Sequence, residues 1–208
     1  MTLTPDLHRR LDALLAARPA GGGRRLLGIA GAPGAGKTTL AAQVREAYAD
    51  VAVVVPMDGF HLPQAVLAER GLAAVKGAPS TFDRAAFESL LARLRDTSET
   101  VTAPAYSREL HAVVPEAISV PPETQIVLVE GNYLGYWPAV RRLLDEIWKL
   151  EVPWDVARER LIARRIATGS GPEAAREWVD RVDAANAMLV ADDFATRVIT
   201  GSDSQGVS

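Results

Sequence analysis

The residues with the clearest chemical meaning form a glycine-rich run from Gly31 to Thr39. The run reads GAPGAGKTT and fits G-x-x-x-x-G-K-[ST], the pattern of a phosphate-binding loop, or P-loop. Glycine permits positive φ angles and close approach to a ligand, so backbone N–H groups can converge on an anion at a helix N-terminus. The pattern predicts these nucleotide-binding residues: Gly31, Gly34, Ala35, Gly36, Lys37, Thr38 and Thr39.

Two side chains of this run have distinct expected roles. Lys37 can reach the β- and γ-phosphate oxygens of a nucleoside triphosphate, and the Thr38 hydroxyl is placed to coordinate Mg²⁺. Residues 25–30 before the run are typical of a buried strand, and residues 40–48 after it of a helix. This context favours a nucleotide site over an ordinary glycine-rich turn. We therefore expect ATP and Mg²⁺ as cofactors, with the choice of purine left open.

Acidic residues follow two further apolar runs. Asp58 comes after residues 51–56, where it could orient a substrate hydroxyl or accept its proton opposite the γ-phosphate. The alternative is a turn aspartate that hydrogen-bonds its own backbone. Glu130 ends the run 125–130, as a Walker B acid does when it holds Mg²⁺ directly or through water. The alternative for Glu130 is a charge that marks the end of a strand.

Arginines gather just before a Gly-Ser-Gly break at residues 169–171. Arg160 and Arg164 are four residues apart and share one face of the predicted helix, and Arg165 adjoins them. Such a face is typical of a lid whose cations neutralise charge on a transferred phosphoryl group, although a solvated basic surface is the alternative. We expect Arg160 to bind nucleotide and Arg164 or Arg165 to act in catalysis.

A third group of residues is expected around the phosphate acceptor. Its members are Asp58, His61, Tyr106, Arg108, His111 and Tyr133. An arginine and a histidine on a loop could hold an acidic or polyhydroxyl substrate, whereas solvation or a surface ion pair is the alternative. His61 taken alone is more typical of a packed histidine than of a catalyst.

The elements that must position these residues alternate between strands and helices. Strands are predicted at residues 25–30, 51–56, 125–130, 146–152 and 197–199. Helices are predicted after Thr4, after Asp83, from Asp155 to about Thr168 and onward from Glu173. The stretch 101–122 holds four prolines and is expected to be irregular. Alternating strands and helices predict a parallel sheet covered on both faces, with ligands at the carboxyl ends of its strands.

Composition and charge bound the class of protein. The chain has 208 residues, of which 48% are hydrophobic and 24% charged, so we expect one domain over residues 1–200, a lid at about 158–190 and a disordered tail at 201–208. A net charge of −3 argues against a nucleic-acid surface, and the absence of cysteine excludes thiolate metal sites. No apolar run reaches the roughly 20 residues of a membrane span. A cytoplasmic location is expected, because the N-terminus lacks signal-peptide features.

The motifs together resemble the P-loop kinases that include uridine kinase, phosphoribulokinase and bacterial pantothenate kinase. GAPGAGKTT, MDGFH at 57–61 and VEGNY at 129–133 carry this resemblance. The similarity to pantothenate kinase extends, in the same order, through VLAERGL at 66–72, KGAP at 76–79 and TAPAYS at 102–107. The chain is shorter than those enzymes. Its segments 159–165, 177–180 and 186–187 are similar to short bacterial kinases labelled fructose transport system kinases or nucleoside/nucleotide kinases.

The resemblance implies an adenylate-kinase-like, three-layer α/β P-loop fold with a helical lid. It also implies roles for individual residues: Lys37 and Thr38 at phosphate and Mg²⁺, Asp58 as base, Glu130 as its acidic partner, Tyr106 and Arg108 near the acceptor, and Arg160, Arg164 and Arg165 in the lid. A homodimer is compatible with it, because related kinases are often dimers.

The expected activity is transfer of the ATP γ-phosphate to a hydroxyl of a small metabolite such as a sugar, a nucleoside or a pantothenate-like acceptor. Phosphorylation of pantothenate specifically is one alternative. A regulatory nucleotide-binding module without a small-molecule acceptor is another, although the predicted base and lid favour transfer chemistry. A GTPase is disfavoured because no Asn-Lys-x-Asp run is present.

Overall fold

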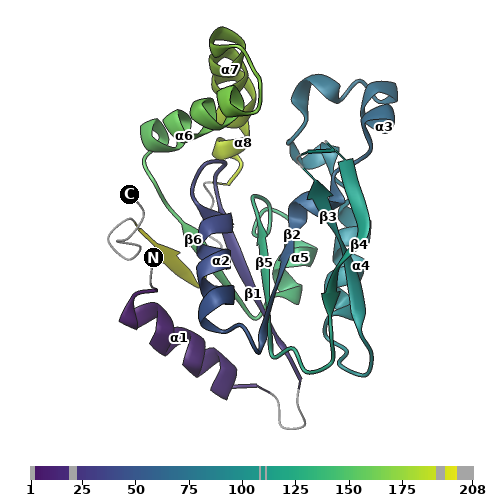
Figure 1. Cartoon of the computed structure of the whole chain (residues 1–208), viewed down its shortest axis with the longest axis vertical. Helices are drawn as coiled ribbons and strands as arrows, with labels where there is room; N and C mark the ends of the chain where they lie inside the picture. Colours follow the sequence, from purple (N-terminus) through teal and green to yellow (C-terminus); the bar gives the residue numbers. More distant parts are fainter. Residues whose placement is uncertain (1–2, 19–22, 108, 111, 191–194, 201–208) are drawn as a thin grey trace.

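The computed structural model describes residues 3–18, 23–107, 109–110, 112–190 and 195–200 (Figure 1). Within them, five parallel strands form one sheet in the order β2-β5-β1-β6-β7. The strands are β1 Arg25–Gly31, β2 Ala52–Pro56, β5 Ile126–Gly131, β6 Glu146–Leu150 and β7 Arg197–Ile199. The prediction of a parallel α/β sheet is confirmed.

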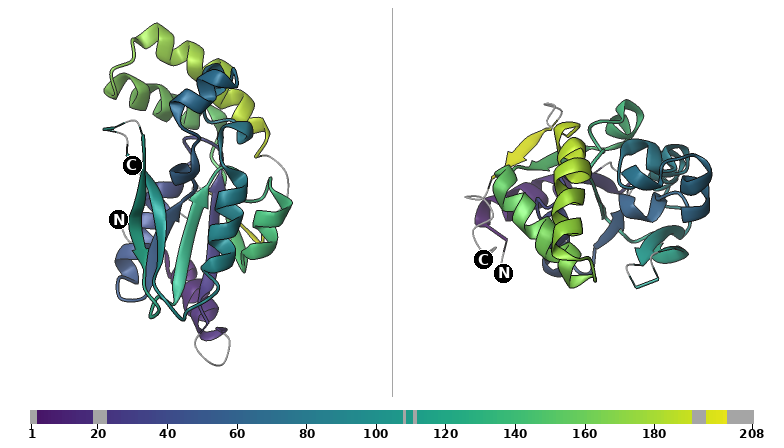
Figure 2. Two further views of the ribbon diagram at one scale, coloured as in Figure 1. Left: turned by 90° about the vertical axis from the view of Figure 1, so that its right-hand side faces the viewer. Right: turned by 90° about the horizontal axis from the view of Figure 1, so that it is seen from above.

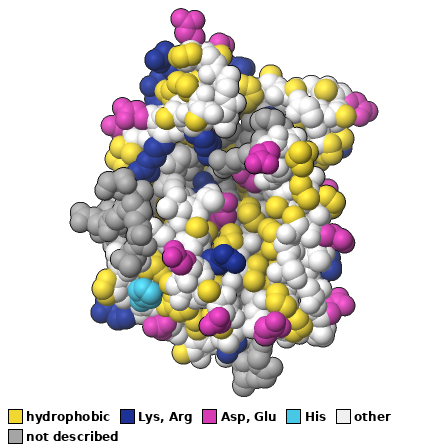
Figure 3. Space-filling model, viewed as in Figure 1, with side chains coloured by type: hydrophobic (Ala, Val, Ile, Leu, Met, Phe, Trp, Pro, Cys, Tyr) yellow, Lys and Arg dark blue, Asp and Glu magenta, His cyan; other side chains and the backbone are white. Residues whose placement is uncertain are grey.

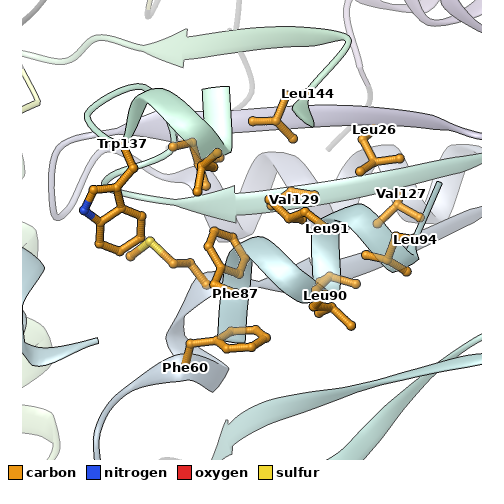
Figure 4. Close-up of a cluster of buried hydrophobic side chains, with 14 of the residues drawn as sticks. Leu26, Phe60, Phe87, Leu90, Leu91, Leu94, Val127, Val129, Trp137 and Leu144 are labelled. Atoms are coloured by element: carbon orange, nitrogen blue, oxygen red, sulfur yellow. The ribbon is translucent and has the colours of Figure 1, made fainter. Parts of the chain in front are cut away.

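Helices cover the sheet on both faces and make three layers. Helices α1 Pro5–Ala16 and α2 Lys37–Ala47 pack on one face with Leu27 and Ile29 of β1. Helices α4 Arg84–Arg93 and α5 Pro138–Leu143 pack on the other face. Figure 4 shows this second face, where Leu26 of β1 and Phe87 of α4 belong to one buried cluster. Strand side chains alternate between faces, so a continuous apolar run such as β1 supplies both cores.

Two helices begin at the residues that their sequences predict. The Thr4 hydroxyl accepts a hydrogen bond from the Leu7 amide at the start of α1. The Asp83 carboxylate accepts one from the Ala86 amide at 2.9 Å at the start of α4. These bonds satisfy amide groups that have no partner inside a helix.

The prediction of an irregular stretch at 101–122 is wrong. Strands β3 Val101–Ser107 and β4 Ala112–Val120 form an antiparallel hairpin. Its register shifts between Ala103 and Ala105, so Pro104 lies where the ladder is interrupted. A two-stranded hairpin has only edge strands, which tolerate proline because the missing N–H can fall outside the ladder.

A helical projection extends beyond the carboxyl ends of the strands (Figure 2). It consists of α6 Trp154–Ala167, α7 Pro172–Trp178, a π-helical turn Val179–Asp183 and α8 Ala184–Met188. Asp155 was expected to cap α6, but the helix starts at Trp154 and Asp155 lies in its first turn. In the described part of the chain, no helix is both long and apolar enough to cross a membrane. The expected tail at 201–208 lies outside the described residues.

The chain between β2 and α4 forms the other side of this end of the molecule. It contains the 3₁₀ turn Met57–Phe60, helix α3 Gln64–Glu69 and the 3₁₀ turns Ala73–Val75 and Pro79–Thr81. Figure 1 shows this segment and the helical projection facing each other across the carboxyl edge of the sheet.

Candidate active site

A cavity of about 510 Å³ opens at the carboxyl edge of the sheet. Its walls come from the P-loop, the segment after β2, the end of β5 and the helical projection. On the face seen in Figure 3, Lys and Arg side chains gather where the helical projection meets the rest of the molecule. The predicted site residues that line the cavity are Gly34, Lys37, Thr38, Asp58, His61, Tyr106, Glu130, Arg164 and Arg165.

Gly34 joins the P-loop to the helical projection. Its φ of 79° lies in the left-handed region, which favours glycine. A Cβ atom at this position would lie 2.7 Å from the carbonyl oxygen of Ala157 in α6. Arg160 of α6 also donates a long hydrogen bond of 3.5 Å to the Gly34 carbonyl. The base of the projection therefore packs directly on the loop.

Lys37 begins helix α2 and is buried beneath the loop. Its ammonium donates hydrogen bonds of 3.0 Å to the carbonyl oxygens of Gly31 and Ala32. Burial lowers the pKa of Lys37, whereas the carboxylates of Glu130 and Asp58 favour its charged form. The two acids that were predicted from separate strands thus act on the same ammonium.

Thr38 and Glu130 meet across the cavity floor. The Thr38 hydroxyl donates to Glu130 Oε1 at 3.2 Å, so the P-loop and the end of β5 present adjacent oxygens. Mg²⁺ prefers oxygen ligands and usually keeps several waters and substrate phosphates in its shell. The donor set fits that ion. Among the described residues no cluster of three His, Asp or Glu side chains offers a separate metal site.

Asp58 lies in the 3₁₀ turn Met57–Phe60, directly after β2, with its side chain at the cavity. The next residue, Gly59, allows the hairpin to approach this turn closely. A Cβ atom at Gly59 would lie 2.3 Å from the Pro104 carbonyl oxygen. The hairpin that the sequence did not predict therefore supports the turn that carries Asp58.

His61 follows the same turn and is partly buried. Its Nδ1 lies 2.9 Å from the Asp58 backbone carbonyl, and because a carbonyl can only accept, this nitrogen carries a proton. The ring packs on Phe82, with centroids 4.0 Å apart, and lies near Tyr106. Burial lowers the pKa of His61, so Nε2 of the neutral ring is left as a hydrogen-bond acceptor.

The lowered pKa of His61 predicts a pH-dependent stability. Below pH 6.5 the unfolded histidine binds a proton that the folded ring resists, so the free energy of unfolding should fall by up to about 1.4 kcal/mol per pH unit until the folded pKa is reached. His61→Asn keeps a donor near Nδ1 and should reduce the slope between pH 6.5 and 5.5. Urea unfolding of both proteins from pH 8 to 5.5 measures this, and equal slopes would contradict it.

The arginines of α6 differ in their surroundings. Arg165 lies 4.4 Å from the centroid of the Trp178 ring and 3.8 Å from the Asp183 carboxylate, and Arg164 lines the cavity beside it. Burial raises the pKa of Asp183, while Arg165 and Arg164 oppose that effect. These contacts join α6 to the π-helical turn and direct two cations toward the P-loop end of the cavity.

Several predicted residues do not reach the cavity wall. Tyr133 is fully buried and its hydroxyl donates to the Gly77 carbonyl at 2.6 Å, so it supports the wall from behind. Gly31, Ala35 and Gly36 shape the loop, Thr39 is exposed on α2, and Arg160 reaches only the loop backbone. Arg108 and His111 lie outside the described residues.

The structure also adds residues that the sequence reasoning did not select. Lys76, Phe82, Trp178, Asp183 and Asn186 line the cavity. Lys76 belongs to the KGAP segment, Asp183 ends the π-helical turn, and Asn186 lies in α8. The resemblance included the segments of Lys76, Trp178 and Asn186, but nothing local to them showed which side chains face the site.

Three features together define a P-loop nucleotide-binding protein. They are a P-loop at the carboxyl edge of a parallel sheet, an acid at the end of the adjacent strand, and a helical segment with basic side chains beside them. Comparison with known proteins agrees with this class. The family described as the AAA ATPase domain matches residues 6–194. The names of similar proteins state a more specific activity than the family description does.

Three relatives are named as kinases. A provisionally named uridine kinase of Schizosaccharomyces pombe is 33% identical over 189 residues, covering 83% of this chain and 80% of that protein. A pantothenate kinase of Clavibacter michiganensis is 35% identical over 136 residues, covering 63% of this chain and 42% of that enzyme. The crystal structure of a provisionally named fructose transport system kinase from Silicibacter sp. TM1040 is 36% identical, covers 96% of this chain and 98% of that one, and has a TM-score of 0.84.

The chain therefore matches the AAA ATPase domain family and belongs to the P-loop kinases related to uridine kinase and pantothenate kinase. The predicted fold and the predicted kinase family are confirmed. The names of the relatives differ in their substrates, so the acceptor has to be inferred from the site.

Proposed function

We propose that this protein transfers the γ-phosphoryl group of Mg²⁺-bound ATP to a hydroxyl group of a small metabolite. One observation carries the proposal: Asp58 lines the same cavity as the P-loop and acts on the charge of Lys37. A carboxylate in that position can meet an acceptor hydroxyl opposite the terminal phosphate. A simple nucleotide switch has no need of such a group.

Each side chain has a role in this proposal. Lys37 binds the β- and γ-phosphates, Thr38 and Glu130 hold Mg²⁺, and Asp58 orients the acceptor hydroxyl. The acceptor oxygen forms a bond to the γ-phosphorus while the bond to the β,γ-bridging oxygen breaks, and the hydroxyl proton passes to Asp58. Mg²⁺ supplies positive charge to the phosphates when it is bound. Arg164 and Arg165 add positive charge from the lid.

The proposed lid over the nucleotide spans about residues 158–190 and includes most of the helical projection. Its base packs on Gly34, and Arg158 forms hydrogen bonds of 2.6 and 2.8 Å with Asp180, which tie α6 to the π-helical turn. A lid held together in this way can close as one unit and keep water from the transferred phosphoryl group.

Pantothenate is a narrower candidate for the acceptor. The segments MDGFH, KGAP and TAPAYS, which resemble pantothenate kinase, contribute Asp58, His61, Lys76 and Tyr106 to one cavity. The 35% identity to the Clavibacter michiganensis enzyme supports this candidate. The matched region is 42% of that enzyme, so its remaining part has no counterpart in the match.

The decisive experiment measures ADP release from ATP and Mg²⁺ in a coupled assay. Pantothenate, uridine, fructose and ribulose 5-phosphate are added separately, and a rate without acceptor is the baseline. We expect one acceptor class to raise turnover at least tenfold, because an oriented hydroxyl outcompetes water in a closed site. Tight ATP binding with a slow rate that no acceptor changes would favour the regulatory module instead.

A further inference from the structure

Lys76 occupies the part of the cavity that the proposed transfer step does not use. It lies between the 3₁₀ turns Ala73–Val75 and Pro79–Thr81, and its side chain lines the cavity together with His61, Phe82 and Tyr106. These four residues come from the segment after β2 and from the hairpin. None of them belongs to the P-loop or to the helical projection.

The contacts of Lys76 leave hydrogen-bond donors available. Its Nζ donates to the Tyr106 hydroxyl at 3.1 Å and lies 5.1 Å from the centroid of the Tyr106 ring. The hydroxyl oxygen accepts this bond, so its own proton can be donated to another group. An ammonium has three N–H donors, and within the described residues this one has a single hydrogen-bond acceptor. The pair therefore presents up to three donors.

The charge of Lys76 is also uncompensated within the described residues. Arg165 faces Asp183 at 3.8 Å and Lys37 faces the loop carbonyls, but no described carboxylate lies within ion-pair distance of Lys76. A partly buried cation without a counter-charge costs free energy, and a bound anion would remove that cost. This combination of donors and charge suits a carboxylate or a phosphate group.

The charged groups near His61 and Lys76 differ from those near Lys37, at the P-loop end of the cavity where the triphosphate is proposed to bind. Burial lowers the pKa of His61 and the charge of Lys76 adds to the effect. Burial likewise lowers the pKa of Lys37, but there the cation that adds to it is Arg164. Asp58 lines the same cavity, and its carboxylate favours the charged forms of both His61 and Lys37.

We propose that the phosphate acceptor is an anion: a hydroxylated metabolite whose carboxylate or phosphate group is bound by Lys76 and Tyr106 while its hydroxyl faces Asp58. This inference rests on the proposed function and narrows its substrate class. Nε2 of neutral His61 can accept a hydrogen bond from a further hydroxyl of the same molecule. Neutral sugars and nucleosides leave the ammonium without a counter-charge and bind less tightly.

The test compares Lys76→Met and Lys76→Arg with wild type and with Arg70→Met. Arg70 is exposed on the same segment and does not line the cavity, so its variant controls for loss of a charge. Calorimetry with Mg²⁺ and ADP present measures the binding of two anionic ligands. Pantothenate is the hydroxy carboxylate, and ribulose 5-phosphate is the sugar phosphate. Uridine and fructose are the neutral ligands.

We expect one anionic probe to bind wild type, and its affinity to fall about 10- to 100-fold in Lys76→Met, as for a lost charged hydrogen bond. The affinity for this probe should fall less in Lys76→Arg and should equal that of wild type in Arg70→Met. The KM for ATP should be unchanged in all three variants. The probe that binds distinguishes a carboxylate from a phosphate.

Three results separate this inference from the proposed function. Binding of a neutral ligand that Lys76→Met does not weaken overturns the inference, and leaves the function intact if that ligand raises turnover. If neither pantothenate nor ribulose 5-phosphate binds, the inference is overturned at any rate of ADP release. Anion binding that is lost in Lys76→Met, without acceptor-dependent ADP release, supports the Lys76 site and counts against the kinase reaction.

Discussion

Asp58→Asn should reduce acceptor-dependent ADP release by about 10²- to 10⁴-fold, the range expected when a positioned base is removed. Asparagine keeps the shape of the side chain but cannot take the hydroxyl proton. Affinity for ATP should stay the same or rise, because a negative charge near the phosphates has been removed. Rapid kinetics with the preferred acceptor, together with fluorescent-nucleotide binding, measure both effects.

The matched control for Asp58→Asn is Asp50→Asn. Asp50 is exposed in the turn before β2 and does not line the cavity, so this variant removes the same charge from the same part of the chain. It should retain wild-type turnover. If Asp58→Asn keeps turnover within threefold of wild type while Asp50→Asn does the same, Asp58 is a turn residue and not the base.

Lys37→Met should weaken ATP binding and reduce turnover by about 10²- to 10³-fold, the loss expected for one preorganised group that stabilises transition-state charge. Methionine keeps an unbranched side chain beneath the loop but offers no donor to the phosphates. Methionine also loses the two hydrogen bonds that Lys37 donates to the Gly31 and Ala32 carbonyls, so the fold of the variant has to be checked. Nucleotide titration and initial rates check the prediction.

Arg45→Met is the control for Lys37→Met. Arg45 is an exposed cation on the same helix, α2, and lies outside the cavity, so its loss tests the effect of net charge alone. It should bind ATP as wild type does. Thermal unfolding of both variants shows that each is folded. A Lys37→Met protein with more than a third of wild-type turnover would contradict the assigned role of the ammonium.

The local parts of the site were predictable because each is encoded in a short stretch of sequence. GAPGAGKTT contains the glycines, the lysine and the threonine of the loop, and apolar runs next to it identify β1 and α2. Asp58 and Glu130 could be assigned to one edge because parallel strands end at the same edge of a sheet. The structure places both carboxylates near Lys37.

The hairpin and the partners of the α6 arginines could not be predicted in the same way. Prolines indicated an irregular stretch at 101–122, yet Pro104 falls at a break in the register, where the loss of a backbone donor costs little. The sequence assigned a nucleotide role to Arg160 and a catalytic role to Arg164 or Arg165, but it did not show the partners of the α6 arginines. Arg158 pairs with Asp180, Arg160 reaches the Gly34 carbonyl, and Arg164 and Arg165 line the cavity. These differences depend on partners far along the chain.

The sequence by itself determined the parallel α/β fold and the nucleotide loop, because periodicity, glycine spacing and strand-end acids are local properties. The kinase family followed from the resemblance of GAPGAGKTT, MDGFH and VEGNY to the motifs of known P-loop kinases. Only the tertiary structure decided that Tyr133 is a buried support while Lys76 faces the cavity. The physical reason is that burial and contact depend on which distant segments pack together. Lys76 and Tyr106 are 30 residues apart, and they meet because the segment after β2 packs against the hairpin.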